Sequence, residues 1–108
     1  MSSMEDRQKG FEAKFAHDAQ MQFKAEARRN KLLGLWAADK MGITGEDADA
    51  YAKEVIAADF EEAGDEDVYR KVAGDLDAKA TGVTEGEIRE QMASLMAEAK
   101  AQLMDEAD

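Results

Sequence analysis

Residues 1–41 read MSSMEDRQKGFEAKFAHDAQMQFKAEARRNKLLGLWAADKM, with no proline and only two glycines, Gly10 and Gly34. Ser2 and Ser3 suit an N-cap position, and acidic residues follow where the helix dipole favours negative charge. The stretch predicts one helix on the order of 55 Å long at about 1.5 Å per residue. A compact domain of about 100 residues has a radius of gyration of about 13 Å. We therefore expect the first half of this helix to extend beyond the rest of the fold.

The two halves of the predicted helix carry different apolar faces. Phe11, Phe15 and Phe23 lie along one side of the first half, whereas Leu32 and Trp36 occupy a neighbouring sector of the second half. We expect the second half to pack into the core, with Trp36 inside it. A short helix without tertiary packing is marginally stable in water. The first half is therefore expected to be frayed or disordered until a partner covers its rings.

Three amphipathic segments follow, each with a start signal. Thr44–Asp47 resembles a capping box, Asp65 can cap the next helix, and Thr84–Glu87 is a full capping box. Gly64 and Gly82 are the expected ends of the first two segments. Short connections predict antiparallel neighbours. The apolar residues at helical spacing are Ala48, Tyr51, Ala52, Val55 and Ala58, then Val68, Val72 and Leu76, then Ile88, Met92, Leu95, Met96, Ala99 and Leu103.

These patterns predict an all-α fold. We expect a four-helix bundle with a long first helix, forming a single domain over residues 1–108. Within that domain, residues 1–19 form an arm and residues 20–108 form the bundle. Gly74, inside the third segment, is expected to weaken its helix by about 1 kcal/mol relative to alanine.

Charge is distributed unevenly along the chain. The net charge is −11, made up of +2 in residues 1–40 and −13 in residues 41–108. An acidic body repels nucleic acid and anionic membrane surfaces, so neither is an expected partner. No apolar run approaches the roughly 18 residues that span a bilayer, and no signal peptide is recognisable. We expect no membrane insertion and a cytoplasmic location. The run Arg28–Lys31 resembles a short nucleic-acid patch, but a solvated face or ion pairs to bundle acids fit it better.

No catalytic set is recognisable. His17 is the only histidine and there is no cysteine, so a catalytic triad or a zinc site cannot be assembled within one chain. Neither a calcium-binding loop nor a phosphate-binding loop motif is present. The sequence therefore predicts a protein without enzyme activity, cofactor or metal. His17 has the chemistry of a pH switch, but an exposed or partner-contacting helix residue is the favoured interpretation.

Two motifs carry a family resemblance: FEAKFAHD at residues 11–18 and RRNKLLGLWAA at residues 28–38. Together with MEDR at residues 4–7, they resemble the alphaproteobacterial ATP synthase inhibitor subunit zeta family over nearly the whole chain. The resemblance implies a four-helix bundle whose N-terminal arm inhibits ATP hydrolysis by the catalytic head of the rotary ATP synthase. It implies that the arm enters an interface between catalytic and non-catalytic subunits, contacts the central rotor, and blocks hydrolysis while leaving synthesis largely free.

The same resemblance implies an inhibitory arm over residues 1–19, joined to the bundle by the Arg28–Ala38 motif. The implied partners are the head subunits and the rotor, met on the cytoplasmic side of the inner membrane, and we expect a monomer when the protein is free. Two alternatives stay open: a generic acidic helical interaction module, such as an adaptor or anti-regulator, and a small-molecule-binding bundle. The expected partner-binding residues are Met4, Arg7, Lys9, Phe11, Glu12, Lys14, Phe15, His17, Asp18 and Phe23.

Overall fold

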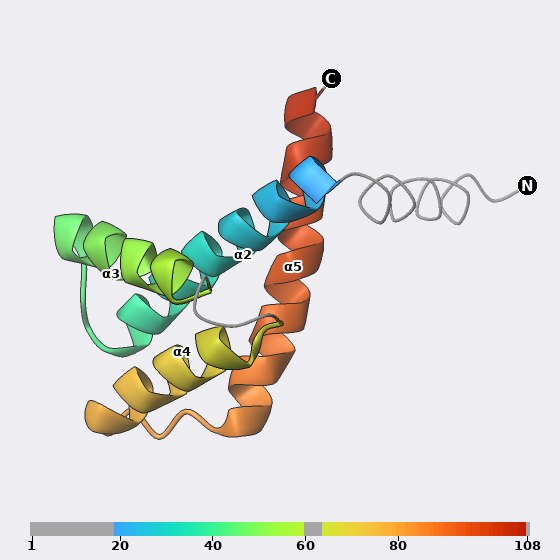
Figure 1. The fold of residues 1–108 in the computed structure, drawn as a ribbon. Helices are drawn as coiled ribbons and strands as arrows, with labels where there is room; N and C mark the ends of the chain where they lie inside the picture. The colour runs from blue at the N-terminus through green and yellow to red at the C-terminus, as the bar shows by residue number, and fades with distance from the viewer. Residues whose placement is uncertain (1–18, 60–63, 108) are drawn as a thin grey trace, which may run out of the picture.

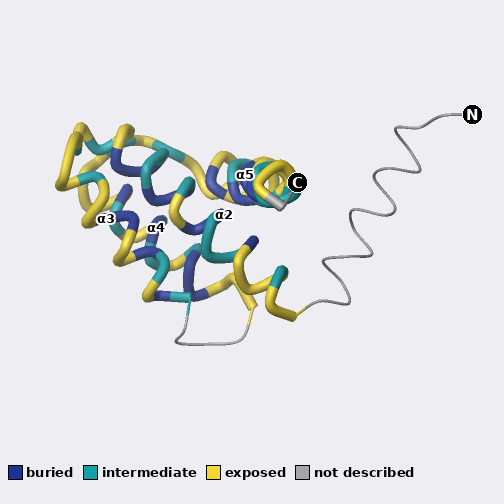
Figure 2. Tube along the Cα trace, turned by 90° about the horizontal axis from the view of Figure 1, so that it is seen from above, coloured by how far each residue is buried: buried dark blue, intermediate teal, exposed yellow. Residues whose placement is uncertain are grey.

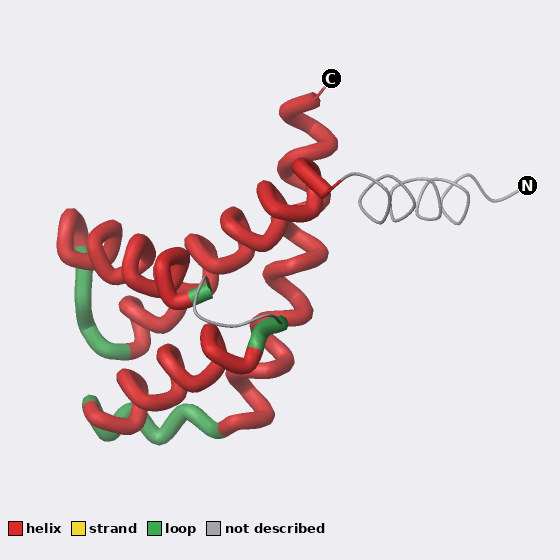
Figure 3. Tube along the Cα trace, viewed as in Figure 1, coloured by secondary structure: helices red, strands yellow, loops and turns green. Residues whose placement is uncertain are grey.

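The computed structural model describes residues 19–59 and 64–107. These ranges hold four helices: α2 (Ala19–Lys40), α3 (Gly45–Ala58), α4 (Glu66–Ala78) and α5 (Glu85–Ala107). Figure 3 shows helices joined by loops, and no strand occurs in the described part of the chain. The predicted all-α fold of four helices is confirmed. Residues 1–18 of the predicted arm lie outside the described part of the chain.

The helices pack around α2 (Figure 1). α3 returns antiparallel to α2, and α4 runs antiparallel to α3, as the short connections predicted. α5 departs from that expectation, because it crosses the other helices steeply in the view of Figure 1. Its C-terminal half contacts the N-terminal half of α2 through Arg28, which hydrogen-bonds to Gln102 and Glu106.

The core lies where the four helices face each other, and Figure 2 shows the buried positions on their inward sides. It is built mainly from aliphatic side chains of all four helices, together with Tyr51, as the helical spacing predicted. The prediction that Trp36 lies inside the core is wrong. Its side chain is only partly buried and packs against the outside of the core cluster, with Lys40 Nζ 5.9 Å from its ring centroid. The cluster comprises Leu33, Ala37, Ala38, Tyr51, Val55, Val68, Val72, Leu76, Ile88, Met92 and Leu95.

Gly34 sets the distance between α2 and α3. A Cβ atom at position 34 would lie 2.6 Å from Ala52 Cα and 3.3 Å from Val55 Cγ2. No pair of helices can hold atoms that close, so only glycine permits this approach of the two backbones. The residue inside RRNKLLGLWAA therefore has a packing role.

Side-chain bonds fasten α4 to the helices on either side. Tyr51 Oη on α3 donates a hydrogen bond of 2.8 Å to Asp75 on α4. Arg89 on α5 pairs with Glu66 at 3.0 Å, and its guanidinium lies 4.0 Å from the ring centroid of Tyr69. The hydrogen bonds from Arg89 lower the pKa of Glu66 below its ordinary value. Polar contacts thus set the position of α4 at the edges of a small aliphatic core.

The predicted helix starts are only partly correct. Glu87 N donates to Thr84 Oγ1 at 3.2 Å, and Thr84 N donates to Glu87 Oε1 at 3.4 Å, so this capping box is formed. Thr44 and Asp65 occupy the N-cap positions of α3 and α4, yet neither makes a side-chain capping bond. The Asp65 carboxylate instead accepts a hydrogen bond from Arg29 on α2.

The predicted helix ends were placed too late. α3 stops at Ala58 and α4 at Ala78, several residues before Gly64 and Gly82. Beyond α4, Ala80 has a φ of +53° and its amide donates to the Asp77 carbonyl, while the Thr81 amide donates to the Leu76 carbonyl. That pair of bonds is a Schellman motif with alanine where glycine is favoured. The preference of glycine for helix ends therefore predicted Gly82, whereas Ala80 takes the left-handed position.

Candidate functional site

The predicted partner-binding residues fall at one end of the chain, and only Phe23 lies within the described residues. It stands on the second turn of α2 with 53% of its surface exposed, and it is the only exposed large hydrophobic side chain of the described part. The other predicted residues lie outside that part: Met4, Arg7, Lys9, Phe11, Glu12, Lys14, Phe15, His17 and Asp18.

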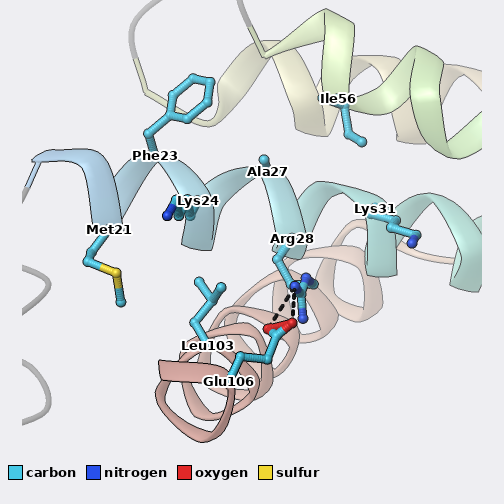
Figure 4. Close-up of a pocket in the computed structure, with 9 residues that line it drawn as sticks. All are labelled: Met21, Phe23, Lys24, Ala27, Arg28, Lys31, Ile56, Leu103 and Glu106. Atoms are coloured by element: carbon cyan, nitrogen blue, oxygen red, sulfur yellow. Dashed lines mark hydrogen bonds and ion pairs between the residues drawn. The ribbon is translucent and has the colours of Figure 1, made fainter. Parts of the chain in front are cut away.

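Beside Phe23 the structure forms an open groove between α2, α3 and α5 (Figure 4). Its volume is about 560 Å³. α3 contributes Ile56 and α5 contributes Leu103, so the groove exists only when the three helices are assembled. The α2 side chains that line it mix apolar and cationic types: Met21, Phe23, Lys24, Ala27, Arg28 and Lys31, with Glu106 of α5 completing the rim.

Arg28 joins the groove to α5. Its Nη1 donates to Gln102 Oε1 at 2.8 Å, and its Nη2 donates to both carboxylate oxygens of Glu106 at 2.9 Å. The hydrogen bonds from Arg28 lower the pKa of Glu106 below its ordinary value. These bonds hold the N-terminal half of α2 to the C-terminal half of α5 at the mouth of the groove.

Arg29 and Asn30 connect the same part of α2 to the residues that flank α3 and α4. Arg29 is 2% exposed, its Nε donates to Asn30 Oδ1 at 2.6 Å, and its Nη2 donates to Asp65 Oδ1 at 2.8 Å. Asn30 Nδ2 donates to Asp59 Oδ2 at 3.0 Å. Asp59 directly follows α3 and Asp65 directly precedes α4, so this network holds both helix ends against α2.

Burial is the main influence on the pKa of Asp59. It raises the pKa of this carboxyl above its ordinary value, although the hydrogen bond from Asn30 and the nearby Arg29 charge act in the opposite direction. The nearby carboxylates Asp65 and Asp67 add to the rise.

The interpretation of Arg28–Lys31 as ion pairs to the bundle is confirmed for Arg28 and Arg29. The groove itself was missed. One signal for it was present, because Lys24, Arg28 and Lys31 recur at i, i+4 and i+7 and so share one face of α2. Its remaining walls come from α3 and α5, and no local pattern in α2 indicates them.

The described residues show no group of three or more histidine, cysteine, aspartate or glutamate side chains arranged to hold a metal ion. Each helix of the described part is either too short or too polar to cross a membrane. The prominent features of this region are therefore an exposed ring, an apolar groove and a cationic stripe.

Comparisons with known proteins give one family match and a similar solved structure. No curated protein matches the chain. A structure solved by NMR in solution is 65% identical in sequence, with a TM-score of 0.72, and the match covers 80% of this chain and 98% of that one. The sequence model that describes the ATPase inhibitor subunit zeta matches residues 1–102. Since this match spans both the predicted arm and all but the end of α5, the chain belongs to the ATPase inhibitor subunit zeta family.

Proposed function

We propose that this protein inhibits ATP hydrolysis by the rotary ATP synthase, with residues 1–19 as the inhibitory arm and residues 20–108 as the bundle that carries it. The observation that carries the proposal is the family match over residues 1–102, because it includes the arm as well as the bundle. The partners would be subunits of the catalytic head and the central rotor, reached on the cytoplasmic side of the inner membrane by a monomeric inhibitor.

The distribution of apolar residues supports this division of labour. Every buried hydrophobic residue of the described part lies between Ala25 and Ala99, within the residues assigned to the bundle. The arm nevertheless carries Phe11 and Phe15 one helical turn apart, interleaved with basic residues. Rings at that spacing form one apolar stripe on a helix. A segment of this kind suits folding into an interface of a partner.

Inhibition by obstruction also fits the chemistry of the chain. A mechanical block of rotation requires buried contact area in the partner and no nucleophile, general base or metal. We propose that the contact is made by the arm residues named above together with Phe23. Phe15 would be a central anchor, because aromatic side chains carry much of the energy of such interfaces.

The test is ATP hydrolysis by the purified catalytic head, titrated with the wild-type protein, with a variant lacking residues 1–18, and with Phe15→Asp. We expect inhibition by the wild type, none by the deletion variant, and severe weakening by Phe15→Asp, because burying an unpaired carboxylate is costly. Glu98→Asp on α5 preserves charge away from the arm and is the matched control. Equal inhibition by all variants would show that the arm is not the active element, and no inhibition by the wild type would refute the proposed function.

A further inference from the structure

We propose that the groove between α2, α3 and α5 is a second contact site for the same partner. It would receive an apolar segment with acidic side chains on the surface of the ATP synthase catalytic head. This inference rests on the proposed function, since it assigns a second docking surface to the inhibitor–head complex.

The surface of the groove favours an apolar occupant. Its walls carry the side chains of Met21, Ala27, Ile56 and Leu103, and Phe23 stands beside them with 53% of its surface exposed. Figure 4 shows Leu103 pointing from α5 toward α2, and Ile56 pointing from α3 toward the same helix. Burying apolar surface contributes about 25 cal/mol per Å². An apolar segment laid into the groove would remove these side chains from water.

The charges around the groove favour an acidic occupant. Lys24, Arg28 and Lys31 form one stripe along α2, and Arg28 is already paired with Glu106. Lys24 and Lys31 are both exposed, and neither has an ion-pair partner within residues 19–59 and 64–107. Residues 41–108 carry a net charge of −13, so this stripe opposes the sign of the body around it. Such a local reversal steers carboxylate groups of a partner to this site.

The groove lies next to the arm along the chain, so the arm and the groove can contact the same partner together. Its α2 residues begin at Met21, directly after the arm, so a head that holds the arm must lie close to the groove. Tethering of this kind raises the effective concentration for a second contact. The α2 wall is also held rigid, because Arg28 bonds it to α5 and Arg29 bonds it to Asp65. A preformed site loses little entropy on binding.

The first test reverses the charges of Lys24 and Lys31 in the full-length protein. Lys24→Glu/Lys31→Glu is compared with Lys53→Glu/Lys79→Glu, which makes the same charge change at exposed lysines outside the groove. Thermal unfolding checks that both variants are folded. We expect the groove variant to need at least tenfold more protein than the control for half-inhibition of ATP hydrolysis by the purified head, while saturating protein still inhibits fully.

The outcomes separate this inference from the proposed function. A wild type that inhibits, with a groove variant that matches the control, would overturn the second contact and leave the arm mechanism standing. A wild type that fails to inhibit would overturn both. Weaker inhibition by the groove variant alone supports the second contact.

The second test identifies the occupant. Leu103, which lines the groove from α5 and is not among the proposed arm contacts, is replaced by the photoreactive residue benzoylphenylalanine in the full-length chain, and the inhibitor is irradiated with the purified head. A cross-link to a head subunit, at a peptide with apolar and acidic residues, supports the proposal. A cross-link to a second copy of this chain, a cross-link to its own arm, or the absence of any cross-link would overturn it.

Discussion

Arg29 is a buried cation, which is an unusual environment for an arginine. A guanidinium is rarely buried unless its donors are satisfied, and here Asn30 and Asp65 satisfy two of them. The pairing is asymmetric, because the Arg29 side chain is 2% exposed while that of Asp65 is 51% exposed. Removing the carboxylate would therefore leave the Arg29 charge without its ionic partner at a position that is 2% exposed.

Asp65→Ala should lower the free energy of unfolding by about 3 kcal/mol, the scale expected when a buried charge loses its partner. Loss of a cap cannot account for such an effect, because Asp65 makes no side-chain capping bond. Chemical denaturation monitored by circular dichroism measures the change. Asp49→Ala, at an exposed position of α3, is the control for loss of one carboxylate. An effect equal to that of the control would mean that the pair with Asp65 does not stabilise Arg29.

Asp59 should make stability depend on acidity. Burial raises the pKa of its carboxyl in the folded protein above the ordinary 3.8. At pH values between the ordinary pKa and this raised pKa, the folded state therefore binds more protons than the unfolded state. The free energy of unfolding then falls as pH rises through this window. Asp59→Asn removes the titration, and an asparagine carbonyl can still accept the hydrogen bond from Asn30.

The variant Asp59→Asn should therefore gain stability relative to the wild type as the pH rises from about 3 to 7, since the wild type alone bears the penalty of the buried charge. Urea unfolding at several pH values measures the difference. Asp49→Asn controls for removal of a carboxylate from α3, the helix that Asp59 directly follows. A difference that shrinks with rising pH would contradict the assignment.

At the scale of the elements, periodicity predicted the helices well and composition predicted their ends poorly. The repeats Val68–Val72–Leu76 and Ile88–Met92–Leu95 gave the buried faces because burial depends on which side of a helix is apolar. The ends depend on tertiary contacts that a sequence does not display. Asp65 bonds to Arg29, 36 positions away, instead of capping its own helix. Ala80 takes the left-handed conformation that was expected of a glycine.

Two glycines inside helices provide a matched pair with opposite expected effects. Gly34→Ala should destabilise the fold by about 2 kcal/mol, because its Cβ would force α2 away from the backbone of Ala52. Gly74→Ala should stabilise it by about 0.5–1 kcal/mol, because a Cβ there meets nothing within 4 Å and alanine favours the helix. Thermal and chemical unfolding of both variants measure the effects. Stabilisation by both substitutions would show that backbone propensity outweighs the packing of α2 against α3, and destabilisation by Gly74→Ala would contradict the expected gain in helix propensity.

At the scale of the whole molecule, the sequence predicted features that arise within one helix and missed features that several helices form together. Four helices and most of the core follow from repeats within each segment. The groove does not, because Phe23, Ile56 and Leu103 come from three helices and meet only after folding. Trp36 shows the same limit: its spacing matched a core position, yet α2 turns it to the margin of the cluster. The arm was predicted from its motif, and its residues lie outside the described part of the chain.

The bundle should fold without the arm. All buried hydrophobic residues of the described part lie between Ala25 and Ala99, so deletion of residues 1–18 removes none of them. The free energy of unfolding should change by less than about 0.5 kcal/mol, as for surface changes remote from the core. Leu33→Ala, by contrast, should cost about 2–5 kcal/mol, because Leu33 is fully buried in the cluster. Denaturant unfolding of the three proteins measures both effects. If the deletion were as damaging as Leu33→Ala, the arm would be part of the folding unit, and loss of inhibition on its removal would no longer identify it as the inhibitory element.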